Sequence, residues 1–171
     1  ASTVREYSDL MNDPSKNEVM HGRVFGILGN RNDEFDAALR EFKYQSVFQE
    51  NNNRTNNGTY AIDAFEEMSS TPASFTSISS ALAAAASRSL VVSVRDALQA
   101  YLQAKIYTKG RIETWVSLPV EYWPDTWFED GNARTMPKYR NPVVLLMLAL
   151  YGHPESGPLW DKLLHGALCT R

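Results

Sequence analysis

The chain has 171 residues, enough for one ordinary domain, and its 43% hydrophobic and 22% charged residues are typical of a globular protein rather than a disordered one. A formal net charge of −3 argues against a free-standing nucleic-acid-binding protein, since such proteins are usually basic, although a local basic groove can lie on an acidic protein. One cysteine, Cys169, excludes an internal disulfide. No apolar run reaches the roughly 18 residues that a membrane span requires, so we expect no membrane partner.

The first part of the chain carries two strand patterns. Residues 1–18 are polar and aperiodic, and we expect a loose N-terminal lead there. Arg23–Leu28 is a short apolar run bounded by glycines, which predicts a strand. Phe42–Gln49 is aromatic-rich and roughly alternating, which predicts a second strand able to pair with the first. The asparagine-rich stretch 51–57 predicts a loop.

A helix and a buried strand are expected in the middle of the chain. Thr71–Pro72 supplies a hydroxyl cap and a first-turn proline, and residues 73–87 hold a run of alanines, the best helix former. Leu90–Arg95 is apolar and β-branched and predicts a buried strand that ends at Asp96. Ile112–Leu118 alternates apolar and polar residues, which predicts a further strand stopped by the proline after it.

The last part of the chain is less regular. Residues 119–141 contain three prolines and two tryptophans and predict an irregular, aromatic-rich excursion. Pro142–Leu148 is apolar but too short to assign by periodicity, whereas Leu159–Leu168 is amphipathic and predicts a helix. Together these patterns predict a mixed α+β fold with short strands.

Asp96 is the residue whose setting points most directly to chemistry. A carboxylate at the end of a buried strand is well placed to hold a divalent metal. Mg²⁺ prefers oxygen ligands, and one or two carboxylates with substrate phosphates and water complete its shell. The alternative is an ordinary surface or capping aspartate, which is the commoner role of this residue type. Tyr101, five residues later, is either the wall of a substrate pocket or a plain core aromatic.

Several segments, in order along residues 20–168, resemble the reverse transcriptase domain of copia-type retrotransposon polyproteins. Val94–Leu102 (VRDALQAYL) looks like the first palm motif of that family. Leu150–Trp160 (LYGHPESGPLW) looks like its Leu-Tyr-Gly signature. Trp115–Pro119 (WVSLP) resembles the family's strand that ends in proline, and Phe42–Gln49 resembles the fingers strand.

The resemblance implies the fingers and partial palm of a polymerase that transfers deoxynucleotides to a primer 3′-hydroxyl with two divalent metals. The implied cofactor is Mg²⁺. The implied partners are an RNA or DNA template-primer, deoxynucleotides and the remainder of a polyprotein, and the implied location is intracellular, cytoplasmic or nuclear. The implied organisation is a lead at 1–19 and one domain at 20–171, with fingers at about 20–90 and 109–141 and palm at about 91–108 and 142–171.

The resemblance also assigns roles to single residues. Asp96 would ligate the catalytic metals, and Ala97 would offer a backbone group near the metal or the triphosphate. Tyr101 would lie under the incoming sugar and exclude a 2′-hydroxyl. Tyr151 would belong to the substrate site, and Gly152 would let template or nucleotide approach the backbone closely because it has no side chain. A simple chain break is the alternative for Gly152.

Two departures from the family bear on activity. Lys43 would be a fingers lysine that contacts the triphosphate, or else a solvated strand lysine, but the arginine usual two residues later is Gln45, which cannot make a charged bidentate contact. The family's next palm motif, an aromatic, any residue and two aspartates, does not occur between Trp160 and Arg171. We therefore expect little or no polymerase activity from this chain alone. The competing hypothesis is a decayed or domesticated fragment that serves as a structural subunit or nucleic-acid-binding module.

Overall fold

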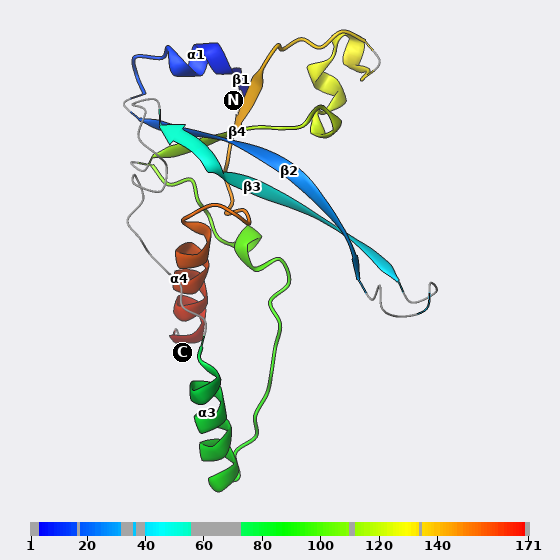
Figure 1. Ribbon diagram of the computed structural model, residues 1–171. Coiled ribbons are helices and arrows are strands. Elements are labelled where there is room, and N and C mark those ends of the chain that lie inside the picture. Colours follow the sequence, from blue (N-terminus) through cyan, green and yellow to red (C-terminus); the bar gives the residue numbers. More distant parts are fainter. Residues whose placement is uncertain are drawn as a thin grey trace.

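The structure, a computed structural model, describes residues 4–16, 18–31, 36, 40–55, 73–109, 112–133 and 135–169. Within this part of the chain, five strands form one sheet in the order β1-β5-β4-β2-β3 (Figure 1). β2 and β4 run parallel and the other neighbours are antiparallel, so the predicted α+β class is confirmed. The strands are β1 (Val4–Glu6), β2 (Val19–Arg31), β3 (Glu41–Thr55), β4 (Glu113–Ser117) and β5 (Pro142–Leu145).

The helices predicted at 73–87 and 159–168 are both confirmed. The first begins after Ser74, whose Oγ accepts a hydrogen bond from the Ser77 amide at 3.1 Å, and Thr71–Pro72 lies outside the described residues. Short 3₁₀ helices occupy the predicted irregular excursion and the segment before β4. The helical elements are α1 (Tyr7–Met11), α3 (Phe75–Ser87), η2 (Ala100–Gln103), η3 (Val120–Tyr122), η4 (Asp125–Trp127), η5 (Glu129–Gly131) and α4 (Ser156–Cys169).

The strands predicted near 23–28, 42–49 and 112–118 are confirmed, and β2 and β3 are longer than predicted. β3 continues to Thr55, so the loop predicted at 51–57 is wrong for residues 51–55. The strand resumes its pairing with β2 at Arg54 and Thr55, opposite His21 and Met20, and the asparagines lie in the irregularity of the register just before them. The two strands form a long twisted ribbon that extends away from the rest of the sheet (Figure 1).

Buried side chains lie on both faces of the sheet, because successive residues of a strand point to opposite faces. β4 is buried on both faces, with Val116 on one and Trp115 on the other. α1 covers the second face. The first cluster is Met20, Val24, Phe48, Val116 and Leu150, and the second is Leu10, Val19, Trp115 and Val143.

The N-terminal residues belong to the fold. Val4–Glu6 pairs with β5 at the edge of the sheet, and Leu10 of α1 is buried in the second cluster. The predicted loose lead is therefore wrong for residues 4–11. An edge strand of three residues followed by a helix of five is too short to produce a recognisable apolar period.

The segment Leu90–Arg95 is extended but unpaired. In the described chain no strand lies beside it, and no hydrogen bond reaches the backbone of residues 91–97. Val91 and Val94 are 96% and 94% exposed. The predicted buried strand ending at Asp96 is therefore wrong. β-Branched residues favour a strand where they fit a pleated, half-buried surface, and the described residues supply no neighbouring strand here.

Hydrogen exchange tests the unpaired state of this segment. We expect the amides of residues 91–97 to exchange near the rate of an unfolded peptide, since no hydrogen bond to the described chain protects them. The amides of Thr114–Val116 in β4, which has strands on both sides, are the internal control and should exchange at least about 100-fold more slowly. Slow exchange at residues 91–94 would instead mean that a paired strand forms there.

Candidate functional site

The six residues that the sequence singles out come from four parts of the fold. Lys43 lies on β3, Asp96 and Ala97 end the extended segment, Tyr101 lies in η2, and residues 151–152 form the turn before α4. Four of the six, Lys43, Asp96, Ala97 and Tyr151, line one open cavity of about 550 Å³.

Tyr101 adjoins this cavity through Tyr151. The centroids of the two rings are 4.7 Å apart with 48° between their planes. The backbone around them is tied together as well, because the Ala149 amide donates to the Ala104 carbonyl at 2.8 Å. η2 and the segment before the turn therefore hold both tyrosines in place, and Tyr101 is half-buried rather than a core residue.

Asp96 lies in an exposed segment that η2 anchors at one end. Gln99 takes a left-handed conformation with φ of 50°, and the Gln103 side-chain amide donates to the Leu98 carbonyl at 2.7 Å. Among the described residues that line the cavity, Asp96 is the only acid and Lys43 the only base. The cavity therefore combines one carboxylate and one ammonium group in a lining of mixed polar and apolar residues.

The turn at Gly152 is packed directly on β3. The Phe48 amide donates to the Tyr151 carbonyl at 2.7 Å. Gly152 has φ of +86°, and a Cβ atom there would lie 2.2 Å from the Phe48 carbonyl oxygen and 3.0 Å from Val47 Cγ1. Gly152 therefore allows a close approach, and the group that approaches it is the backbone of β3.

His153, which the sequence did not single out, is buried behind this turn. Its Nδ1 accepts a hydrogen bond from the Glu155 amide at 3.2 Å, so the neutral ring carries its proton on Nε2 and donates it to Thr114 Oγ1 at 3.0 Å. Burial lowers the pKa of His153 to about 3. Ser156 Oγ donates to the Leu150 carbonyl at 2.7 Å and accepts from the Leu150 amide at 3.1 Å. These bonds fix the chain between β5 and α4.

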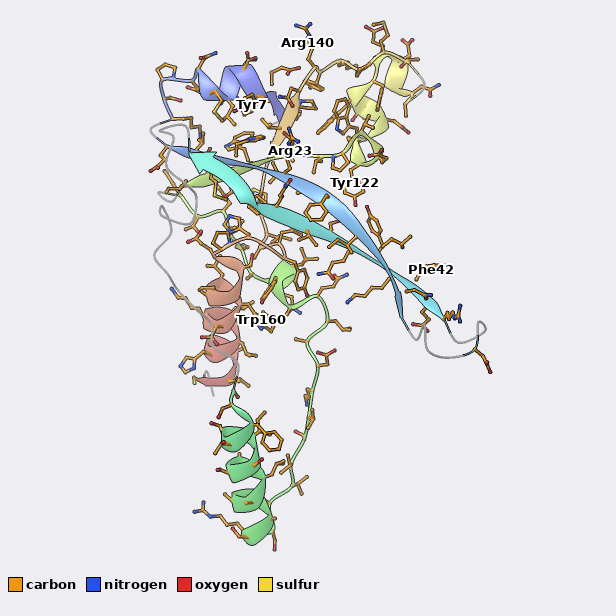
Figure 2. The ribbon with its side chains drawn as sticks, in the orientation of Figure 1. Tyr7, Arg23, Phe42, Tyr122, Arg140 and Trp160 are labelled. Carbon is orange, nitrogen blue, oxygen red and sulfur yellow. The ribbon has the colours of Figure 1, made fainter. Side chains whose placement is uncertain are left out.

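Hydroxyl groups on β3 were also missed by the sequence reasoning. Tyr44 and Ser46 line the cavity, and both form hydrogen bonds to the Tyr122 hydroxyl from η3, the Ser46 bond at 3.3 Å. Tyr122 lies beside the β2–β3 ribbon, whereas Phe42 near its far end is 80% exposed (Figure 2). Alternation along β3 was the available signal, since Tyr44 and Ser46 share a face with buried Phe48.

No family model, no curated protein and no solved structure matches the chain. Across the described residues, no three His, Cys, Asp or Glu side chains lie close enough together to hold a metal ion. None of the helices in the described ranges is both long enough and apolar enough to cross a membrane. The basis for a functional assignment is therefore the cavity itself together with the sequence resemblance.

Replacing Gly152 tests the close approach to β3. Gly152→Ala should lower the free energy of unfolding by about 3 kcal/mol or more, because it adds a clash with the Phe48 carbonyl to a left-handed conformation. Gly131→Ala is the matched control, since φ is +65° there with nothing within 4 Å of the new Cβ, and it should cost about 1–2 kcal/mol. Urea unfolding would measure both, and equal losses would contradict the proximity of Phe48.

The buried imidazole predicts a pH dependence of stability. The pKa of His153 is about 3 when folded against an ordinary value of 6.5, so the unfolded chain binds the extra proton between these limits. The contribution of His153 to the free energy of unfolding is fully present above pH 6.5. It falls by at most about 1.4 kcal/mol per pH unit toward pH 3.

Urea unfolding from about pH 7 to about pH 5 would measure this slope. His153→Gln should reduce it, because the amide can still donate to Thr114 but does not titrate; His21, whose pKa burial also lowers, keeps its own part of the slope. His165→Gln, on the exposed surface of α4, is the control and should keep the slope of the unaltered protein. A slope that stays unchanged in His153→Gln would argue against the buried neutral ring.

Proposed function

We propose that this protein is a portion of an RNA-directed DNA polymerase of the copia type, and that the Asp96 cavity receives a deoxynucleotide. The observation that carries the proposal is convergence. Three segments assigned to the substrate site by sequence resemblance alone, around Lys43, Asp96 and Tyr151, line the same cavity. They come from β3, from the segment before η2 and from the turn before α4.

The chemistry of the lining suits a nucleoside triphosphate. Lys43 brings a positive charge for the phosphates, and the hydroxyl groups of Tyr44 and Ser46 add hydrogen-bonding capacity. Tyr101, braced by Tyr151, would lie under the sugar and exclude a 2′-hydroxyl. A cavity of about 550 Å³ is within the usual range for small-molecule sites.

The described residues fit one magnesium ligand rather than a complete metal centre. Asp96 is the only acid in the described lining, and an Mg²⁺ ion held there would take water and phosphate oxygens as its other ligands. A two-ion site needs carboxylates that hold both ions about 4 Å apart, and the described residues do not supply them. The role proposed for the described residues is therefore nucleotide binding by Asp96, Lys43 and Tyr101.

A non-catalytic structural subunit or nucleic-acid-binding module is the second candidate. Two observations favour it: Asp96 lies on an exposed segment without a paired strand, and Gln45 replaces the arginine usual in the family. A module of this kind would bind a template-primer through phosphate contacts, without a metal requirement and with an affinity that falls steeply with salt.

Binding of dATP with Mg²⁺ tests the proposal, with isothermal titration calorimetry as the measurement. Lys43→Gln should weaken binding about tenfold, because it removes a charge-assisted hydrogen bond to phosphate. Asp96→Asn should remove the Mg²⁺-dependent part of the affinity. The matched controls are Lys162→Gln and Asp161→Asn, which make the same charge changes on the exposed surface of α4 and should leave the affinity unchanged.

The outcomes separate the two candidates. Equal effects of Asp96→Asn and Asp161→Asn would overturn the role of Asp96. Salt-sensitive, metal-independent binding of a template-primer, without dATP binding, would favour the non-catalytic module. Robust primer extension that Asp96→Asn abolishes would support the polymerase and contradict the low activity expected from the sequence.

A further inference from the structure

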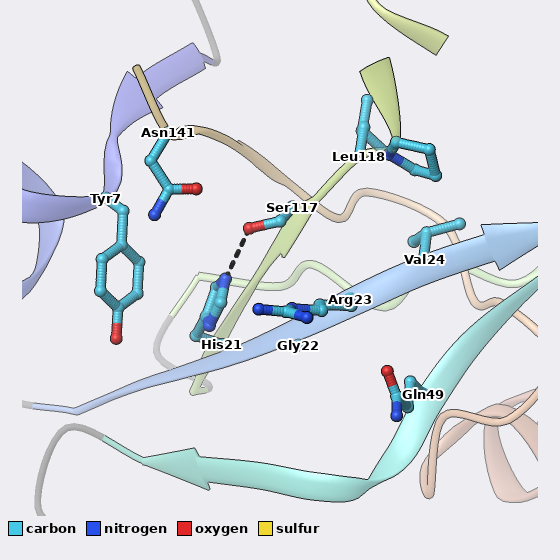
Figure 3. A pocket seen from close by; sticks show the side chains of 10 residues that line it. Tyr7, His21, Gly22, Arg23, Val24, Gln49, Ser117, Leu118 and Asn141 are labelled. Atoms are coloured by element: carbon cyan, nitrogen blue, oxygen red, sulfur yellow. Dashed lines mark hydrogen bonds between the residues drawn. The ribbon is translucent and has the colours of Figure 1, made fainter. Parts of the chain in front are cut away.

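A second cavity, of about 650 Å³, lies on the sheet beside α1 (Figure 3). None of its lining residues lines the Asp96 cavity, so what it binds does not depend on the proposed polymerase function. Its polar side chains come from α1, from β2, β3 and β4, and from the residue before β5. They are Tyr7, His21, Arg23, Gln49, Ser117 and Asn141.

The register of the sheet builds this cavity. Arg23 lies opposite Gln49 of β3 and opposite Ser117 of β4, so the three side chains form one row across the sheet. His21 is two residues before Arg23 on the same face and lies opposite Trp115. Trp115 packs against the residues of α1. The row that contains Arg23 is not covered in this way, and its side chains line the cavity.

Arg23 is the only charged side chain among the described residues that line the cavity. The Arg23 guanidinium reaches toward the His21 ring (Figure 3), and within the described ranges no carboxylate forms an ion pair with it. No acid is present among the described residues that line the cavity. Guanidinium groups bind phosphate and carboxylate oxygens in bidentate geometry, so the chemistry of this lining suits an anionic ligand.

Aromatic groups form one wall of the same cavity. The rings of Tyr7 and His21 lie 4.6 Å apart, and the His21 imidazole shares a hydrogen bond of 2.9 Å with Ser117 Oγ (Figure 3). Burial, with a smaller effect from Arg23, lowers the pKa of His21, so the ring is neutral at pH 7. A neutral imidazole and a phenol ring are suited to contact the face or edge of a planar group.

Asn141 is held rigidly at the rim. Its backbone amide donates to Glu6 Oε2 at 3.0 Å, and its carbonyl accepts from the Tyr7 amide at 3.0 Å. Its side-chain amide points toward the cavity (Figure 3) and makes no hydrogen bond to any other described residue. An amide carries both donors and an acceptor, which is the complement of a polar base edge.

We propose that this cavity binds a nucleoside phosphate, either as a free mononucleotide or as one unit of a single strand. Arg23 takes the phosphate, Tyr7 and His21 contact the base, and the Asn141 amide meets its polar edge. The cavity volume of about 650 Å³ is within the range of small-molecule sites. The Ser117–His21 pair has the spacing of a nucleophile and its base, but no carboxylate in the described chain orients the imidazole, so we assign the pair to binding.

Calorimetric titration of the whole protein with AMP, adenosine and inorganic phosphate tests this site. AMP should bind at least about tenfold more tightly than adenosine or inorganic phosphate, because the site recognises both the nucleoside and the phosphate group. Arg23→Gln should weaken AMP binding about tenfold, whereas Arg88→Gln, an equal charge change at the end of α3, should leave it unchanged. Tyr7→Leu should weaken binding about fivefold or more, and Tyr7→Phe, which keeps the ring, should not.

A twelve-residue oligothymidylate identifies the source of the ligand. If it binds more tightly than AMP and Arg23→Gln removes that advantage, the site takes one unit of a single strand; if AMP binds more tightly, the site takes a free nucleotide. Adenosine binding as tight as AMP binding would overturn the role of the anion. Equal losses in Arg23→Gln and Arg88→Gln would overturn the site and leave only general charge attraction.

Discussion

The hydrogen bond from the Phe48 amide to the Tyr151 carbonyl ties the β2–β3 ribbon to the turn before α4. On one side of it stands the β2–β3 ribbon, and on the other stand the turn and α4 (Figure 1). Gly152 lets the two backbones meet, and buried Phe48 packs beneath the contact with the His153 ring 4.9 Å away. Tyr151, which this contact holds, lines the Asp96 cavity and packs against the ring of Tyr101.

Local sequence patterns identified the elements that local interactions can build. The alanine-rich α3 and the amphipathic α4 follow from helix propensity and period, and the strands around Phe48 and Val116 follow from apolar runs between turns. The length of β3 could not be predicted in this way, because pairing with β2 decides where that strand ends. The strand predicted at Leu90–Arg95 was wrong for the opposite reason. The composition of this segment suits a strand, but the described chain supplies no partner strand for it.

In the candidate sites, too, residues within a sequence motif were predicted, whereas residues that depend on tertiary contacts were not. Lys43, Asp96 and Tyr151 were found from motifs, and the structure brings them to one cavity. His153 was missed because a single buried histidine has no periodic or spacing signal, and its role becomes visible only when Thr114 lies beside it. The second cavity was missed because its residues meet across a parallel and an antiparallel pairing that no local pattern encodes.

The two cavities depend on one strand register. Ser46 lines the first and Gln49 lines the second, and their positions on β3 differ by an odd number, which places them on opposite faces. A shift of one residue between β2 and β3 would exchange the faces and dismantle both cavities together. On the face of the second cavity, the same register places Arg23 opposite its partners on β3 and β4.

The exposed run Ser89–Val94 has a consequence for the behaviour of the protein at high concentration. It is uncharged, free of proline and rich in valine, the composition that favours intermolecular cross-β stacking. Arg88 and Arg95 bracket it, and neither side chain forms a hydrogen bond or ion pair within the described residues. Charges that flank an unavoidable apolar segment act as gatekeepers against aggregation. We therefore expect the two arginines to oppose association of this unpaired segment with other copies of the chain, by repulsion between chains rather than by any contact within one.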